Sequence, residues 1–166
     1  MSKIKLNLGC GEQILPGYIN VDLYCDKADI KADVKKLPFD NDYADEVYSS
    51  HVIEHFDFKE SWDVLEEWKR VLKPGGVLII ETPDMFGMCK RFVESDEQFR
   101  IELYGGFFAC PWIPGQTHKF LYTETQLKWA LDQLGFTNIE RVVADSHYVL
   151  KETQDIFLKV IANKGE

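Results

Sequence analysis

Short apolar runs separated by turn residues dominate the first half of the chain. A run of four to six residues bounded by glycine, proline or acidic residues is typical of a β-strand in a buried sheet. Five such runs predict strands at residues 4–8, 18–23, 28–33, 45–50 and 77–81, the third of them the weakest. Because a helical segment separates the last two, the pattern predicts a mostly parallel sheet in an α/β layer fold.

A helix is predicted between the fourth and fifth of these strands. Asp57 stands three residues before Glu60, the spacing of a capping box, in which each side chain bonds the other's backbone. The apolar residues that follow recur at helical spacing and form one stripe, made of Trp62, Leu65, Trp68 and Leu72. The helix is predicted to end at Lys73-Pro74-Gly75-Gly76, where proline disfavours a helical residue before it and glycine begins a turn.

The second half of the chain has a different pattern of apolar and turn residues. Ser95 to Gln98 predicts a helix start leading to Tyr104, and residues 105–115, rich in glycine, proline and aromatics, predict an irregular loop facing a ligand. A second capping box, Thr123 with Gln126, predicts a helix that stops at Gly135. Residues 139–144 and 156–162 predict two closing strands without an intervening helix, so we expect them to pair antiparallel at an edge of the sheet.

Composition narrows the class of protein. The chain has 166 residues, a formal net charge of −9 and 45% hydrophobic residues, which suits a single domain (residues 1–166) and excludes a disordered chain. Within it we expect a core at 4–84, an acceptor or lid segment at about 85–122, and a closing helix and strands at 123–163. The acidic segment 40–67 disfavours nucleic-acid binding, and no run is long enough for a membrane span. The four cysteines show no metal spacing, which favours free thiols in a reducing cytoplasm.

Three strand ends offer groups that can hold a ligand. Gly9 and Gly11 follow the first strand, where glycine permits a positive φ and lets a ligand approach the backbone. Asp22 ends the second strand and could accept both hydroxyls of a ribose, and Asp33 ends the third and could bond an adenine amino group. A nicotinamide site would need a third glycine where Ile14 stands, and a phosphate loop would need a following lysine. The order of groups therefore predicts an adenosine ligand without a pyrophosphate, although acids that merely end strands on the surface remain the alternative.

The chain resembles a known family at these positions. Its motifs fall in the order of the class I S-adenosylmethionine-dependent methyltransferases: Asn7 to Gly11, Asp22, Asp33 with Leu37-Pro38-Phe39, His51 to His55, and Arg70 to Gly76. The resemblance covers residues 4–84 strongly and 121–136 more loosely. It implies a Rossmann-like, doubly wound, mostly parallel seven-stranded sheet with an antiparallel edge strand, and S-adenosylmethionine lying over the strand ends.

The resemblance also implies roles for individual residues. Gly9, Cys10 and Gly11 would pass under the methionine part, with Asn7 ordering the turn through its amide. Asp22 and Leu23 would border the ribose, Asp33 and Val34 the adenine, and Ser50 with His51 the sulfonium. The chain departs from the family in lacking an acid at Asn7 and a glycine at Gln13. It also has no room for the first crossover helix, and we expect the missing helix to leave the sheet face near Leu6, Leu8 and Val21 to a homodimer partner or to a cover made from residues 85–112.

The candidate catalytic residues are histidines. His51 and His55 follow the fourth strand and share one face with Glu54 if that turn is helical, and His118 precedes the late helix and could close over the same crevice. A histidine can act as a proton acceptor near neutral pH, and His118 is the first choice because a loop flanked by glycine and proline is a poor place for a core residue. For His55, and more so for Glu54, a structural role is the alternative. Phe107, Phe108 and Trp112 shape an acceptor pocket or form a lid that packs on the sheet.

A divalent metal is the disfavoured alternative to this metal-free centre. Some relatives, the ubiquinone-pathway O-methyltransferases and the small-RNA 2′-O-methyltransferases, look similar here and bind such an ion through Glu-x-x-Glu-His and a later histidine. This chain has His51 in place of the first carboxylate, which would favour a nitrogen-seeking ion such as zinc or nickel.

Taken together, the sequence predicts a cytoplasmic S-adenosylmethionine-dependent methyltransferase. Its acceptor is expected to be a small or medium-sized molecule, such as a sugar or glycan precursor, and its product S-adenosylhomocysteine. The alternatives are a non-catalytic module of the same fold, which binds the cofactor or a partner, and a nicotinamide-binding module.

Overall fold

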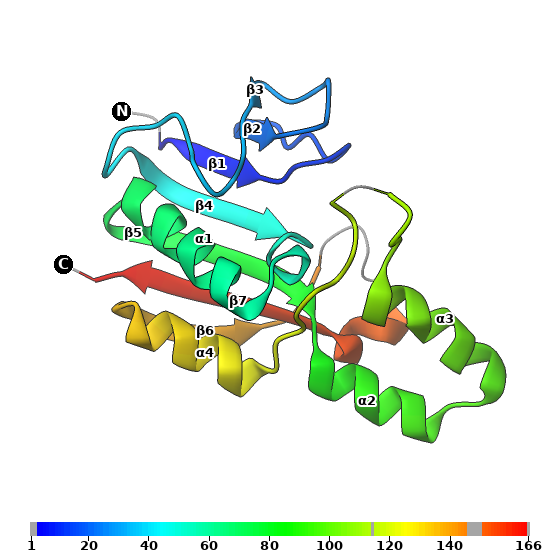
Figure 1. Cartoon of the computed structure of the whole chain (residues 1–166). Helices are drawn as coiled ribbons and strands as arrows, with labels where there is room; N and C mark the ends of the chain where they lie inside the picture. The colour runs from blue at the N-terminus through cyan, green and yellow to red at the C-terminus, as the bar shows by residue number, and fades with distance from the viewer. Residues whose placement is uncertain (1–2, 114, 146–150, 166) are drawn as a thin grey trace.

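A single seven-stranded sheet organises the chain (Figure 1). The computed structural model describes residues 3–113, 115–145 and 151–165. Its strands run in the order β3-β2-β1-β4-β5-β7-β6, with the bounds β1 (Lys5–Leu8), β2 (Ile19–Asp22), β3 (Ile30–Lys31), β4 (Ala44–Ser50), β5 (Leu72–Pro83), β6 (Phe136–Val142) and β7 (Phe157–Lys164). The first five strands pair in parallel, and β7 pairs antiparallel with both β5 and β6. The predicted Rossmann-like sheet, with an antiparallel pair at one edge, is confirmed.

The helices occupy two distinct places around the sheet. They are α1 (Phe58–Val71), α2 (Met85–Glu94), α3 (Glu97–Phe108) and α4 (Glu124–Gln133), with the short 3₁₀ helices η1 (Ile53–His55) and η2 (Lys151–Ile156). In Figure 1, α1 and α4 lie on the same face of the sheet, whereas α2 and α3 form a hairpin beyond the carboxyl ends of the parallel strands. No helix in the described part of the chain is long and apolar enough to cross a membrane.

Helix α1 forms as its sequence predicts but ends earlier. Asp57 and Glu60 make the predicted capping box, and Leu65 and Trp68 are completely buried on the sheet. The expected turn at residues 73–76 is wrong, because β5 already begins at Leu72. Leu72 pairs with Ala44 of β4, and the register then shifts before Val77 pairs with Glu46. Pro74, Gly75 and Gly76 therefore lie within β5, at an irregularity in its pairing with β4.

The segment after β5 holds more helix than predicted. Helix α2 was not anticipated, and α3 runs through Gly105 and Gly106 to Phe108, where an irregular loop was expected. A Cβ on Gly106 would lie 2.8 Å from the terminal methyl carbon of Met88 on α2. Glycine at position 106 therefore lets α3 approach α2 closely. In the sequence pattern alone, this glycine indicates a turn. Of the predicted loop at 105–115, residues 109–113 and 115 lie outside any helix or named strand.

The core lies between the sheet and the two helices on its covered face. Leu6, Leu8 and Val21 are completely buried in this core together with Leu65 and Trp68. We expected the missing crossover helix to leave Leu6, Leu8 and Val21 uncovered. This expectation is wrong, because all three belong to the same core as the buried residues of α1. The absence of a helix between β1 and β2 is confirmed, since residues 9–18 connect the two strands by turns.

The glycine turn after β1 depends on the residue that follows β4. Gly9 has a φ of +66°, and a Cβ placed there would lie only 2.4 Å from a methyl carbon of Val52. Gly9→Ala should therefore destabilise the fold by about 1–3 kcal/mol, the usual cost of forcing atoms into a packed site. Urea denaturation measures the change in the free energy of unfolding.

Gly17→Ala is the matched control for this prediction. Gly17 also has a positive φ, +81°, but nothing lies within 4 Å of its Cβ position, so only backbone strain should appear. Equal losses in the two variants would show that the contact between Gly9 and Val52 contributes nothing.

Candidate functional site

The carboxyl ends of four parallel strands bring the predicted ligand-binding groups into one row. The sheet order places β3, β2, β1 and β4 side by side. The row accordingly contains Asp33 beyond β3, Asp22 at the end of β2, the glycine turn after β1, and Ser50 with His51 at the end of β4. Parallel strands with this arrangement present a crevice at their carboxyl ends, where ligands bind in open α/β sheets.

Backbone and amide hydrogen bonds hold the glycine turn in shape. The N–H groups of Gly9 and Cys10 both donate to the Val21 carbonyl, at 2.8 and 3.1 Å. The Asn7 amide nitrogen donates to the Gln13 carbonyl at 2.8 Å and to the Asn20 side-chain oxygen at 2.9 Å. The expectation that Asn7 orders the turn through its amide is confirmed. The Asn7 side chain is buried among these partners, so it holds the turn from the side that faces the protein interior.

Asp22 is more engaged with the protein than the sequence suggested. One carboxylate oxygen accepts from the Gly11 N–H at 2.9 Å, and the other accepts from the N–H groups of Tyr24 and Cys25 at 2.7 and 2.8 Å. A carboxylate has about four acceptor positions. The oxygen that Gly11 contacts therefore retains room for one further donor, which suits one ribose hydroxyl better than two.

The end of the row at Asp33, where the sequence predicts the adenine site, is open. The Asp33 carboxylate accepts from the Lys35 N–H at 2.9 Å, and its side chain is 40% exposed. Val34 is buried, and its carbonyl accepts from the Trp68 indole N–H at 3.1 Å. Leu23, next to Asp22, is exposed. These residues line an accessible edge, as expected of a chain with few covering helices.

Cys10 lies in the turn as an unreactive thiol. Its side chain is buried, and burial, with a contribution from the negative charge of Asp22, raises its pKa to about 12. The group is therefore a neutral thiol at physiological pH and packs as a small apolar side chain.

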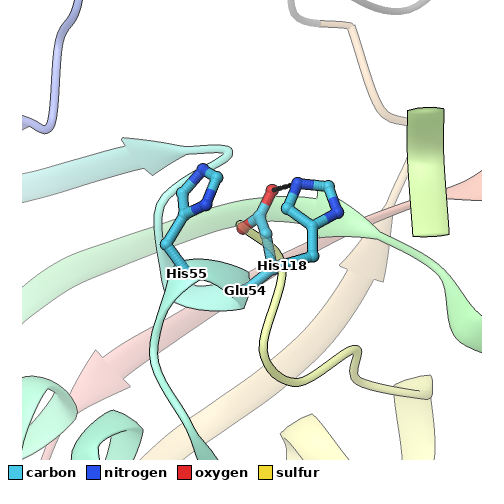
Figure 2. A group of neighbouring side chains, drawn as sticks. All are labelled: Glu54, His55 and His118. Carbon is cyan, nitrogen blue, oxygen red and sulfur yellow. Dashed lines mark ion pairs between the residues drawn. The ribbon is translucent and has the colours of Figure 1, made fainter. Parts of the chain in front are cut away.

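A buried carboxylate lies at the centre of the candidate catalytic group. Glu54 in η1 is completely buried. One of its oxygens lies 3.1 Å from Nδ1 of His51 and 3.9 Å from Nε2 of His118, and the other accepts a hydrogen bond from the Thr82 hydroxyl at 3.1 Å. Figure 2 shows Glu54 and His118 turned toward each other, with His55 beside them.

Backbone contacts bring His118 to this group from far along the chain. The Glu54 carbonyl accepts from the N–H groups of Lys119 and Phe120, at 2.8 and 3.3 Å. Nδ1 of His118 lies 2.7 Å from the Gly106 carbonyl, and Nδ1 of His55 lies 3.2 Å from the Thr117 carbonyl. Each of these ring nitrogens therefore carries the proton when its ring is neutral, because a carbonyl can only accept. The rings of His55 and His118 are 5.0 Å apart.

The group combines a charged carboxylate with a neutral imidazole. Burial acts to raise the pKa of Glu54, but the hydrogen bond from His51 and the charges of the three nearby imidazoles outweigh it and lower the pKa. Burial lowers the pKa of His118, although the charge of Glu54 opposes the shift. At neutral pH His118 is therefore uncharged, with Nε2 able to accept a proton on the side of the Glu54 carboxylate.

Sequence reasoning found the histidines but undervalued two other residues. A structural role was the stronger alternative for Glu54 than for His55, and the Glu54 side chain contacts His51 and faces His118. Thr82 was not singled out at all. Its only sequence signal is its position at the carboxyl end of a buried strand, beside the row of strand ends described above.

Three of these side chains also fit a divalent cation. Glu54, His55 and His118 each offer a ligand atom within 4.8 Å of the others. The carbonyls at Nδ1 of both histidines would leave Nε2 of each ring for the ion, as in many histidine metal sites. One carboxylate and two imidazoles suit a nitrogen-seeking ion rather than magnesium.

Comparisons with known proteins agree with the fold. A methyltransferase domain family matches residues 13–80, and a search of curated proteins gives no match. A solved SAM-dependent methyltransferase from Archaeoglobus fulgidus is 20% identical, with a TM-score of 0.63, over 98% of this chain and 86% of its own.

Two further solved structures are similar over 99% of this chain. A SAM-dependent methyltransferase from Methanosarcina mazei has 21% identity and a TM-score of 0.67 over 93% of its own length. The 1,6-didemethyltoxoflavin-N1-methyltransferase of Burkholderia thailandensis, solved with 1,6-didemethyltoxoflavin and S-adenosylhomocysteine, has 16% identity and a TM-score of 0.64 over 72% of its length. The chain thus matches a methyltransferase domain model over residues 13–80 and has the fold of the solved SAM-dependent methyltransferases.

Proposed function

We propose that the chain transfers the methyl group of S-adenosylmethionine to a small or medium-sized acceptor and releases S-adenosylhomocysteine. The observation that carries the proposal is the buried Glu54 with His51 and His118 directly beyond β4, next to the glycine turn. A proton acceptor beside a cofactor crevice is the arrangement that methyl transfer to a hydroxyl or ammonium group requires.

The residues of the row can hold the cofactor. Gly11 has a φ of +49° and nothing within 4 Å of its Cβ position, so the turn leaves open space for the methionine part above it. Asp22 would accept one ribose hydroxyl, and Asp33 with Val34 would border the adenine. Ser50 and His51 would flank the sulfonium at the end of β4. The similar Burkholderia structure, which holds S-adenosylhomocysteine, supports this class of cofactor for the fold.

His118 would accept the proton that the acceptor loses. When bound, the cofactor supplies a methyl group on a sulfonium, which an aligned nucleophile can take. The Gly106 carbonyl fixes the neutral tautomer of His118, so Nε2 presents its lone pair and takes the acceptor's proton. The resulting imidazolium lies 3.9 Å from the Glu54 carboxylate, whose charge stabilises it. His51 holds Glu54 in place, and His55 keeps the 117–120 segment against η1.

One alternative function, a non-catalytic module, is separated from the enzyme by a simple measurement. A non-catalytic module of the same fold would bind S-adenosylhomocysteine but form none of it from S-adenosylmethionine with any cell metabolite. We further propose a sugar or glycan precursor as the acceptor and a cytoplasmic location. Turnover with a pool of metabolites is the experiment that tests the proposed activity itself.

Asp22→Ala should weaken S-adenosylhomocysteine binding. Loss of one hydrogen bond to a charged acceptor costs about 1–3 kcal/mol, and isothermal calorimetry measures the change. Because three backbone N–H groups also bond this carboxylate, the variant should melt at a lower temperature, so the folded fraction must be checked first. Asp40→Ala removes an exposed acid away from the strand ends and serves as the control. Unchanged affinity in folded Asp22→Ala would refute the ribose contact.

His118→Ala should lower turnover while leaving the cofactor bound. Loss of a general base reduces the rate by about 10²–10⁴-fold, whereas affinity for S-adenosylhomocysteine should stay within about twofold, since no cofactor contact is assigned to this ring. Lys119→Ala is the matched control, because the exposed lysine next in the chain pairs only with Glu60 at the surface. Full turnover in His118→Ala would contradict its role as proton acceptor.

Metal analysis tests the metal-free form of the centre. Protein purified without a histidine tag should contain only substoichiometric zinc, nickel, iron or manganese, because His118 acts here as a proton acceptor and not as a ligand. Dialysis against a chelator should then leave turnover unchanged. One equivalent of bound metal, lost in Glu54→Gln, would show instead that Glu54, His55 and His118 form a metal site.

A further inference from the structure

An uncharged segment borders the candidate centre. Charged residues make up 28% of the chain, yet no Asp, Glu, Lys or Arg occurs between Leu103 and Thr117. Both ends of this segment are held at the histidines. Gly106 and Phe108 bond His118 through their carbonyls, and the Thr117 carbonyl contacts His55. The segment therefore lies next to the proposed site of methyl transfer, where the acceptor must bind.

Four large apolar or aromatic side chains of this segment are exposed to solvent. Trp112 is 78% exposed, Phe108 57%, Tyr104 51% and Ile113 46%. The rings of Tyr104 and Phe108 are stacked, with centroids 6.2 Å apart. Contiguous exposed apolar side chains on a folded protein commonly mark a binding surface.

The same surface reaches the cofactor side of the crevice. A Cβ on Gly115 would lie 3.3 Å from the ring of Tyr24, so this part of the loop approaches the end of β2. Tyr24 is 67% exposed and follows Asp22 by two residues. In Figure 1 the loop rises from α3 toward the carboxyl ends of β1 and β4 before it returns to α4. Exposed aromatic side chains thus border the crevice from both the acceptor segment and β2.

The charges around the crevice are unsuitable for an anionic ligand. Three nearby lysines each pair with a carboxylate. Lys27 pairs with Glu12, and Lys119 pairs with Glu60. Lys35 pairs with both Asp33 and Glu60. The nearby Asp22 and Asp33 add negative charge, and the chain as a whole has a net charge of −9. Recognition of a phosphate or carboxylate normally uses a cationic side chain at the contact.

We propose that Tyr104, Phe108, Trp112 and Ile113 bind the non-reacting part of the acceptor, and that this part is an uncharged ring with a flat apolar face. The proposal rests on the proposed methyltransferase function and specifies its substrate class. Aromatic side chains stack on flat rings without needing any charge, and the apolar face of a neutral sugar or an aromatic ring meets this requirement equally well. A phosphorylated acceptor is disfavoured.

Saturation-transfer NMR with three probes tests the proposal. The probes are 2-naphthol, methyl β-D-glucopyranoside and 2-naphthyl phosphate, each measured near neutral pH with and without S-adenosylhomocysteine. At least one neutral probe should bind, and 2-naphthyl phosphate should bind more weakly than 2-naphthol. The first two probes distinguish an aromatic from a sugar acceptor. Absence of binding by both neutral probes, or equal or tighter binding of the phosphate, would overturn the proposal.

A pair of tryptophan variants places the binding on this surface. Trp112→Ala should weaken the neutral probe at least about fivefold, the lower end of what loss of one stacked aromatic side chain costs. Trp129→Ala is the matched control, since this tryptophan is also exposed, at 51%, but lies on α4 against Trp62. Equal effects of the two variants would overturn the assignment.

Calorimetry with S-adenosylhomocysteine on the same samples separates the two proposals. Failure of the cofactor to bind, with the ring probe still bound through Trp112, would defeat the methyltransferase function and leave the surface assignment standing.

Discussion

The burial of the Glu54 carboxylate is the constraint on which the candidate centre depends. A charged group without solvent is costly unless it is paired and hydrogen-bonded. Here the side chain is satisfied by His51 and Thr82 and faces His118, while the carbonyl of the same residue binds the backbone of residues 119 and 120. One residue therefore joins the end of β4, the end of β5 and the segment before α4. Removal of the carboxylate would disturb all three.

These contacts of Glu54 explain why His118, more than sixty positions further along the chain, lies at the end of β4. The described residues of the 109–117 segment form no helix or named strand, but Gly106 just before it contacts His118 and Thr117 at its end contacts His55 of η1. The hairpin of α2 and α3 also lies next to the candidate centre, because the last residues of α3 supply the carbonyls that contact His118. The acceptor side of the molecule is thus positioned by hydrogen bonds to the centre, while its exposed aromatic side chains remain available to a ligand.

The cofactor side depends on a different kind of contact. Gly9 packs against Val52 so closely that no side chain fits, and Asp22 bonds Gly11 as well as its own strand end. The turn after β1 is therefore shaped by β2 and by the residue after β4, which compensates for the missing first crossover helix. Contacts between strand ends thus hold the turn where no helix lies between β1 and β2.

The sequence alone determined the strands, the two capped helices and the row of groups at the strand ends. These features depend on local spacing: apolar periodicity, capping boxes and glycines that follow a strand. It also indicated His51, His55 and His118, since histidines beside strand ends and glycine-rich loops are conspicuous.

Tertiary contacts decided the rest. Gly105 and Gly106 read as a loop in the sequence, but both lie in α3, where Gly106 packs against Met88 of α2. Leu6 and Leu8 were expected on a bare face, but the covered face of the sheet buries them. Glu54 and Thr82 gain their importance only when β5 and the 117–120 segment meet η1. A carboxylate's partners depend on which distant segments surround it, and local sequence spacing carries no information about that.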